Sequence, residues 1–371
     1  MNLVETLGVE IGVRQAGTAQ AAESAEAIAD AFRELGLEPR FQEFPFLAYD
    51  ADEPTLEIDG EEWSAAPCLY AHPTEAAGIK GRLHYLGVQV VVADLFEAPT
   101  WAIEGEDGAD LGRILANPLG GGAVPFGSGY GYALTPPSAF VSTADGERLR
   151  EHEGAHVRLV VRGAFRPGAR DRNVIAELAG ESAEAILVSA HFDSVWRGPG
   201  TVDNATGVEG VRRVAERLAG RKLERSVVFV GFAAEEIGCA GSRYYVIEAK
   251  TRGELDRIVG VVNLDCIAHG DQLQIWASPD ELRGRALELA RVSGLDRRYD
   301  LLARAAGPGT DHFFFAQEEI PAASILYLPY PEYHLPDERM ELVDEQKLAD
   351  AVDLAVALVE SQLTRPVARP G

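Results

Sequence analysis

The sequence has 371 residues, of which 46% are hydrophobic and 25% are charged, and its formal net charge is −25. This length and composition are typical of a globular protein with one large or two medium domains. The negative charge disfavours anionic partners, because their phosphates would be repelled, so we expect neither nucleic acid nor a membrane surface as a partner.

The cysteines and the N-terminal segment give an indication of the cellular compartment. Cys68, Cys239 and Cys266 form no C-x-x-C pair and no even set, which disfavours a disulfide framework. The N-terminus lacks the basic and apolar regions of a secretory signal, and no apolar run reaches the roughly 18 residues that a membrane span needs. We therefore expect a cytoplasmic location, with export left open. The oligomeric state is also open, a homodimer included.

The chain begins with a helical pattern followed by a strand pattern. Residues 18–35 are rich in Ala, Glu and Asp, and place Ile28 and Phe32 on one apolar stripe. Gly36 follows as a stop signal, so the pattern predicts a helix. Residues 41–46 then alternate between apolar and polar side chains, as a strand does.

Residues 56–165 differ from the rest of the chain, because helical periodicity is weak and short β-type runs are separated by turns. These runs are 56–58, 88–92, 139–141 and 157–161. We predict an inserted β-rich domain over 56–165 and a second domain made of residues 1–55 and 166–371. The glycine-rich stretch 118–131 lacks G-x-G-x-x-G spacing and a following helix, so we interpret it as a loop without phosphate-binding function.

From about residue 170 onward, strand-like and helix-like runs alternate. The strand-like runs are 173–178, 185–189, 226–232, 258–264, 272–276 and 323–328. The helix-like runs are 206–218, 241–250, 280–292 and 345–363. Such alternation predicts an α/β fold, in which a mostly parallel mixed sheet is sandwiched by helices.

Five potential metal ligands each follow a predicted strand or lie in a loop beside one. They are His191, Asp203, Glu236, Asp265 and His334. Taken singly, each is explained as a cap or a solvated loop residue. Taken together, two imidazoles and three carboxylates suit zinc, and five ligands are too many for one tetrahedral ion with an open position. They fit two ions that share a bridging carboxylate, and Glu235 is then left as a general base.

The motifs that contain these residues resemble, in order, those of the co-catalytic di-zinc aminopeptidase family. That family includes bacterial leucyl aminopeptidases, aminopeptidase Y and glutamate carboxypeptidase relatives. The motifs are HFDS at 191–194, DNATG at 203–207, EE-x-G at 235–238, NLD at 263–265, TDHFFF at 310–315 and YHLPDE at 333–338. The six motifs are specific as a set. Residues 56–165 also resemble the protease-associated insert of some members, through residues 137–149.

The resemblance implies which metal ligands belong to which ion. Asp203 would bridge two Zn²⁺ ions. His191 and Asp265 would complete one site, and Glu236 and His334 would complete the other. Other divalent metals could replace zinc in vitro.

The resemblance also implies roles for residues around the metals. Glu235 would be the general base, and Tyr333 would donate a hydrogen bond to the oxyanion of the tetrahedral intermediate. Asp193 would hold the second ring nitrogen of the first histidine ligand. Asp311 and His312 would have supporting roles.

One position departs from the family's pattern. Many members have a second Asp directly after the bridging one, whereas this sequence has Asn204. The bridging ligand itself is retained, so we expect the metal site to be kept with less negative charge around it.

The function that the resemblance implies is a zinc aminopeptidase, which removes N-terminal residues from peptides with a free N-terminus. A dipeptidase, a carboxypeptidase or an N-acyl amino acid hydrolase would use the same metal site and stays open, as does the side-chain specificity. A non-catalytic receptor-like relative is disfavoured, because all five ligands and Glu235 are present. A serine hydrolase is disfavoured because the sequence has no G-x-S-x-G motif.

Overall fold

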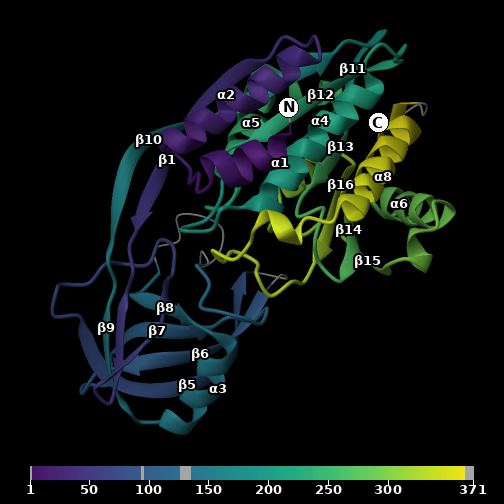
Figure 1. Ribbon diagram of the computed structural model, residues 1–371. Helices are drawn as coiled ribbons and strands as arrows, with labels where there is room; N and C mark the ends of the chain where they lie inside the picture. Colours follow the sequence, from purple (N-terminus) through teal and green to yellow (C-terminus); the bar gives the residue numbers. More distant parts are fainter. Residues whose placement is uncertain (1, 93–95, 126–134, 364–371) are drawn as a thin grey trace.

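The computed structural model describes residues 2–92, 96–125 and 135–363. Two long antiparallel strands, β1 (Arg40–Ala51) and β10 (Gly163–Leu178), connect its two parts (Figure 1). One part is an eight-stranded sheet covered by helices, and the other is a second eight-stranded sheet. The second sheet is formed by residues 55–160, which we call the insert.

The first sheet has the strand order β1-β10-β12-β11-β13-β16-β14-β15. Four adjacent strands, β12, β11, β13 and β16, run parallel to one another, whereas β10 and β14 flank them in the antiparallel sense. This confirms the predicted mostly parallel mixed sheet. The remaining bounds are β11 (Ser182–His191), β12 (Arg225–Phe232), β13 (Ile258–Leu264), β14 (Gln272–Ser278), β15 (Asp300–Arg304) and β16 (Ala322–Leu328).

Helices cover both faces of this sheet, which explains why its central strands are almost continuously apolar. In β12, Val227 and Phe229 enter one hydrophobic core, and Val228 and Val230 enter the other. The first core includes α2 (Ala19–Glu34), α4 (Gly207–Leu218), α6 (Asp280–Val292) and α8 (Glu345–Leu363). The second includes α5 (Ala240–Arg252) and α7 (His312–Gln317).

The predicted helix at residues 18–35 is confirmed as α2. Thr18 caps it, since its Oγ1 accepts a hydrogen bond from the backbone N–H of Ala21 at 3.2 Å. Ile28 and Phe32 are buried, and the Phe32 ring packs against Phe229 with centroids 6.2 Å apart. The apolar stripe therefore fixes which face of the helix covers the sheet.

The insert has the strand order β3-β2-β9-β5-β6-β7-β8-β4 and its own core around Trp101 and Phe140. Its elements are β2 (Thr55–Ile58), β3 (Glu61–Trp63), β4 (Ala66–Pro67), β5 (Ile79–Val92), β6 (Phe96–Glu104), β7 (Asp110–Ala116), β8 (Ser138–Val141), α3 (Thr143–Leu149) and β9 (His156–Val160). Within 118–131, residues 118–125 form a loop, and residues 126–131 lie outside the described residues.

Several elements carry no clear sequence pattern. Strands β6 and β7 contain Glu97, Pro99, Asp110 and Gly112, so pairing with neighbouring strands overrides a weak local preference. The aromatic run after Asp311 lies in helix α7, which has no counterpart among the predicted helix-like runs. Unpredicted short helical segments are α1 (Leu3–Glu5), Thr6–Ile11, Arg150–His152, Thr201–Thr206, Leu255–Arg257, Leu295–Arg297 and Met340–Leu342. Among the described residues, no helix is long and apolar enough to cross a bilayer.

Candidate metal centre

The five predicted ligands meet at the carboxyl ends of the four parallel strands, which is where open α/β sheets bind their ligands. His191 ends β11, Glu236 follows β12, Asp265 follows β13, His334 lies in the loop after β16, and Asp203 lies between β11 and α4. All five side chains are at most 8% exposed. Strands distant in sequence therefore bring one cluster of imidazoles and carboxylates together.

Asp203 lies between the two histidines of this cluster. Its Oδ1 is 3.0 Å from Nε2 of His191, and its Oδ2 is 3.3 Å from Nε2 of His334. On the first side, Oδ1 of Asp265 is 3.4 Å from Nε2 of His191. On the second side, Oε2 of Glu236 is 3.1 Å from Nε2 of His334. Two sets of three donors therefore share one carboxylate.

The cluster's unsatisfied polar atoms fit a bound cation. Oδ1 of Asp203 and Oε1 of Glu236 are buried and make no hydrogen bond within the described part of the chain. A buried carboxylate oxygen without a partner is costly, and a cation would offset that cost. Ligand atoms of His191, Asp203 and Glu236 lie within 4.8 Å of one another. This combination of imidazole and carboxylate donors suits zinc.

Electrostatics across the cluster favour positive charge. Burial raises the pKa of Glu236 to about 7, with the His334 charge acting in the opposite direction. Burial raises the pKa of Glu235 well above its usual value, although the His191 charge again opposes it. Burial would also raise the pKa of Asp203, but the two nearby histidines hold it well below the usual range. A divalent cation bound among these carboxylates would favour their charged forms.

Asp193 holds the turn that carries the two adjacent glutamates. Its Oδ1 accepts a hydrogen bond from the backbone N–H of Glu235 at 2.9 Å, and its Oδ2 accepts one from that of Glu236 at 3.2 Å. Its Oδ1 lies 3.6 Å from Nδ1 of His191, which is longer than a hydrogen bond. Asp193 therefore lies closer to the backbone of the two glutamates than to the His191 ring that it is predicted to hold.

The remaining predicted residues differ in how they face the cluster. Burial raises the pKa of Asp311 to about 7, and its charge acts on Glu235. His312 instead pairs with Thr310, Nδ1 to Oγ1 at 2.5 Å, and burial lowers its pKa to about 3. The Tyr333 ring stacks on the adjacent His334 ring, with centroids 3.9 Å apart and planes 18° apart. All three residues belong to motifs that resemble those of the family, so the sequence alone could not predict how differently their side chains are oriented.

Glu338 joins the two loops that supply Asp203 and His334, although sequence reasoning gave it no role. Its Oε1 accepts hydrogen bonds from the backbone N–H groups of Val202 at 2.9 Å and Asp203 at 2.7 Å. Its Oε2 accepts the Tyr330 hydroxyl at 3.3 Å and the His334 N–H at 3.4 Å. Its place in the YHLPDE motif was the available signal, but its partners Val202 and Asp203 are more than 130 residues away.

Asn204 has a structural use that explains an amide at this position. Its Nδ2 donates a hydrogen bond to the carbonyl oxygen of Leu264 at 2.9 Å, which a carboxylate could not do. Its Oδ1 accepts hydrogen bonds from the N–H groups of Gly207 at 2.8 Å and Cys266 at 3.2 Å. Asn204 therefore ties the Asp203 loop to the end of β13 and the start of α4.

Arg14 is a buried cation beneath the cluster, and no motif marked it. Its guanidinium donates hydrogen bonds to five backbone carbonyls, those of Leu7, Gly12, Phe192, Pro199 and Gly200. Three of them belong to the segment between His191 and Asp203, so Arg14 fixes the path of the chain between these two ligands. Its charge also faces Asp193, and it lowers the cost of burying so many carboxylates.

Replacing Arg14 by Met is expected to lower the free energy of unfolding by about 3–5 kcal/mol, because buried carbonyls and carboxylates lose their cationic partner. Urea unfolding measures this change. Arg33→Met is the matched control, since Arg33 is exposed and pairs with Asp30 at 2.5 Å, and it is expected to change stability by less than about 1 kcal/mol. Similar effects of the two substitutions would contradict the role of Arg14.

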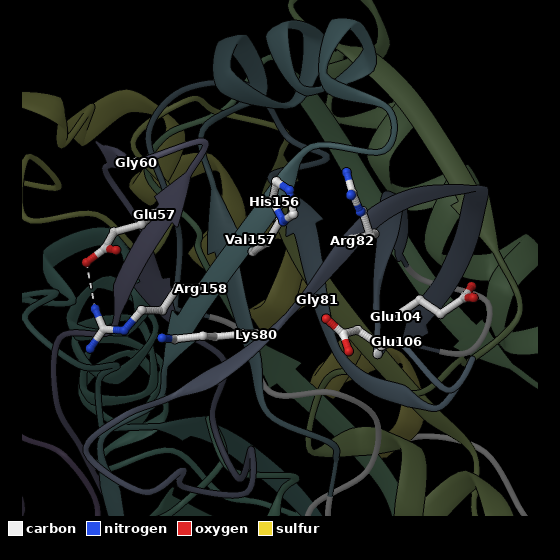
Figure 2. Close-up of a pocket in the computed structure, with 11 residues that line it drawn as sticks. Glu57, Gly60, Lys80, Gly81, Arg82, Glu104, Glu106, His156, Val157 and Arg158 are labelled. Carbon is white, nitrogen blue, oxygen red and sulfur yellow. Dashed lines mark hydrogen bonds and ion pairs between the residues drawn. The ribbon is translucent and has the colours of Figure 1, made fainter.

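Cavity size does not identify this site. A cavity of about 690 Å³ lies away from the cluster, on the outer face of the insert (Figure 2). There Arg158 pairs with Glu57 at 2.6 Å, and Lys80 lies across from Arg158 on the neighbouring strand. Cations and carboxylates are mixed along this face, as on an ordinary solvated sheet surface. A far smaller cavity, of about 20 Å³, abuts the cluster at Asp193 and Glu236.

Comparisons with known proteins agree with the geometry. Residues 173–359 match the model of a family described as peptidase family M28. Aminopeptidase YwaD of Bacillus subtilis is 26% identical to this chain, over 96% of the chain and 82% of that protein.

Solved structures share the fold. BSAP, a zinc aminopeptidase from Bacillus subtilis, superposes with a TM-score of 0.74 at 23% identity, covering 99% of this chain and 95% of that one. A peptidase M28 precursor from Shewanella amazonensis superposes with a TM-score of 0.77 at 19% identity, covering 99% of this chain and 94% of that one. These likenesses extend over both sheets, the insert included.

Proposed function

This chain belongs to peptidase family M28, whose model matches residues 173–359, and we propose that it is a zinc aminopeptidase with two zinc ions. The observation that carries the proposal is the position of Asp203, whose two oxygens each face a different histidine. A carboxylate placed in this way suits a bridge between two ions. Relatives named as aminopeptidases support the same activity.

The two halves of the cluster would each hold one ion. His191 and Asp265 would bind one zinc together with Asp203, and Glu236 and His334 would bind the second. Zinc held there would polarise the scissile carbonyl of a peptide and lower the pKa of the attacking water.

The protein's own groups would handle the protons and the substrate. Glu235 takes a proton from the attacking water and passes it to the departing nitrogen, which suits a buried carboxylate with a raised pKa. The Tyr333 hydroxyl donates to the developing oxyanion. The surplus of buried carboxylates favours a substrate whose free α-amine is positively charged over one that is N-acylated. These features together favour an aminopeptidase over the other hydrolases that could use the site.

Zinc removal and return tests the proposal. Dialysis against a chelator is expected to abolish peptide hydrolysis, and stepwise addition of zinc is expected to restore it, with full activity near two equivalents per chain. Zinc content by atomic emission and hydrolysis of an aminoacyl p-nitroanilide are followed on the same samples. Full activity at one equivalent, with no further binding, would contradict two ions.

Three other expectations remain predictions from the sequence. They are the cytoplasmic location, the absence of nucleic-acid and membrane partners, and the domain boundaries.

A further inference from the structure

The insert contacts the loop that carries His334. This loop follows β16 and lies between the two parts of the molecule (Figure 1). Tyr333 and Leu335, on either side of His334, both pack against the hydrophobic core of the insert, as does Leu119. A metal ligand is therefore flanked by two side chains that the insert holds.

Gly121 of the insert packs tightly against this loop. A Cβ built on Gly121 would lie 2.5 Å from the carbonyl oxygen of Pro331 and 3.6 Å from Cδ1 of Leu335. Contacts under 3 Å with a backbone atom cannot be relieved by a side-chain rotation, so one of the two loops would have to move. The packing at this point leaves room for glycine alone.

Gly121 cannot readily yield, because the insert fixes its backbone. Buried Asn117 donates two hydrogen bonds from Nδ2, to the carbonyl oxygens of Gly120 and Gly122, each at 2.8 Å. Thr143, at the start of α3, donates its N–H to the carbonyl oxygen of Gly121 at 3.2 Å and its hydroxyl to that of Asn117 at 2.8 Å. The backbone around Gly121, which contacts the His334 loop, is thus held in place by hydrogen bonds within the insert.

Within the His334 loop, aromatic contacts set the position of the imidazole ring. The Tyr333 ring stacks on His334, and the Tyr330 ring packs against Tyr333 edge-on, with centroids 5.5 Å apart. His334 in turn faces Asp203 and Glu236 through Nε2. Ligand distances in a zinc site tolerate errors of only about 0.2 Å, so a small displacement of this loop is sufficient to weaken binding.

We propose that Asn117 and Gly121 of the insert are positioning residues for His334, so that the insert completes the half of the metal centre formed by Glu236 and His334. The inference rests on the proposed zinc site, because it concerns how one of its ligands is held. It gives the insert a part in metal binding. A contact that merely joined the two parts would stabilise the fold without changing the affinity for zinc.

Two neighbouring glycines allow a matched test. Gly120 and Gly121 have φ of +88° and +89°, so alanine meets nearly the same backbone strain at either position. Among the residues that the structure describes, a Cβ on Gly120 meets nothing within 4 Å, whereas one on Gly121 meets Pro331. Gly121→Ala is expected to weaken the binding of one of the two zinc ions by about 10- to 100-fold, and Gly120→Ala to leave both affinities unchanged. Zinc titration of the chelator-treated full chain against a chromophoric competitor measures both.

The outcomes separate the inference from the function on which it rests. Wild-type protein that binds fewer than two zinc ions overturns the two-ion proposal and the inference with it. Wild-type protein with two ions, and equal affinities in both alanine variants, overturns the inference alone. If Gly121→Ala does not fold by circular dichroism, Asn117→Asp replaces it, because the carboxylate loses both Nδ2 hydrogen bonds. Unchanged zinc affinity in that folded variant also overturns the inference.

Discussion

Replacing Glu235 by Gln is expected to lower kcat by about 10²- to 10⁴-fold and to leave zinc binding intact. The amide has nearly the same size but cannot take a proton from the attacking water. Glu235 is 9% exposed, and its Oε1 accepts a hydrogen bond from the thiol of Cys239 at 3.2 Å, so its orientation is already fixed. Steady-state kinetics and zinc content are measured on the same preparation.

The adjacent residue provides the matched control. Glu236→Gln changes the same atoms one position along the chain, but it removes a predicted ligand that faces His334 at 3.1 Å. This variant is expected to lose zinc together with activity. Turnover retained by Glu235→Gln, or zinc lost equally from both variants, would contradict the assignment of Glu235 as the base.

Replacing Asp203 by Asn is expected to reduce activity by at least about 10³-fold, because both proposed ions would depend on this side chain and Lewis-acid stabilisation of the transition state contributes several kcal/mol. An amide offers one neutral oxygen where the carboxylate offers two charged ones. Those two oxygens face the two histidines at 3.0 and 3.3 Å. Zinc content by atomic emission is expected to fall well below that of Asp265→Asn, which affects one side only.

The comparison of these two variants isolates the shared ligand. Asp265 lies only on the His191 side of the cluster, at 3.4 Å, so its replacement is expected to leave the ion near His334 in place. A protein with Asn at position 203 that still holds one tightly bound zinc ion would show that Asp203 serves a single ion.

The central sheet and the cluster could be predicted because both follow from local patterns. Strands β11, β12, β13 and β16 are buried on both faces, and they appear as continuous apolar runs in the sequence. Parallel strands end at one edge, so the polar residues after each run become neighbours whatever their distance along the chain. This rule is sufficient to bring His191 and His334 to one site without knowledge of side-chain geometry.

The residues that support the cluster could not be predicted, because their partners are distant in sequence. In the sequence, Arg14 cannot be told from a surface arginine. Only the folded chain brings the carbonyl groups of Phe192 and Pro199 to its guanidinium. Glu338 lies in an acidic stretch of an acidic protein, and only its burial distinguishes it. The contact between Gly121 and Pro331 likewise depends on how two parts of the molecule meet, which no local pattern encodes.

The most direct test of a zinc aminopeptidase is digestion of matched peptides, with free and N-acetylated amino termini, by the zinc-loaded protein, followed by mass spectrometry. We expect stepwise loss of single N-terminal residues from the free peptides and no cleavage of the acetylated ones. That result would also give the side-chain preference. Cleavage of acetylated peptides, or release of residues from the carboxyl end, would contradict the aminopeptidase and assign the metal centre to another hydrolase.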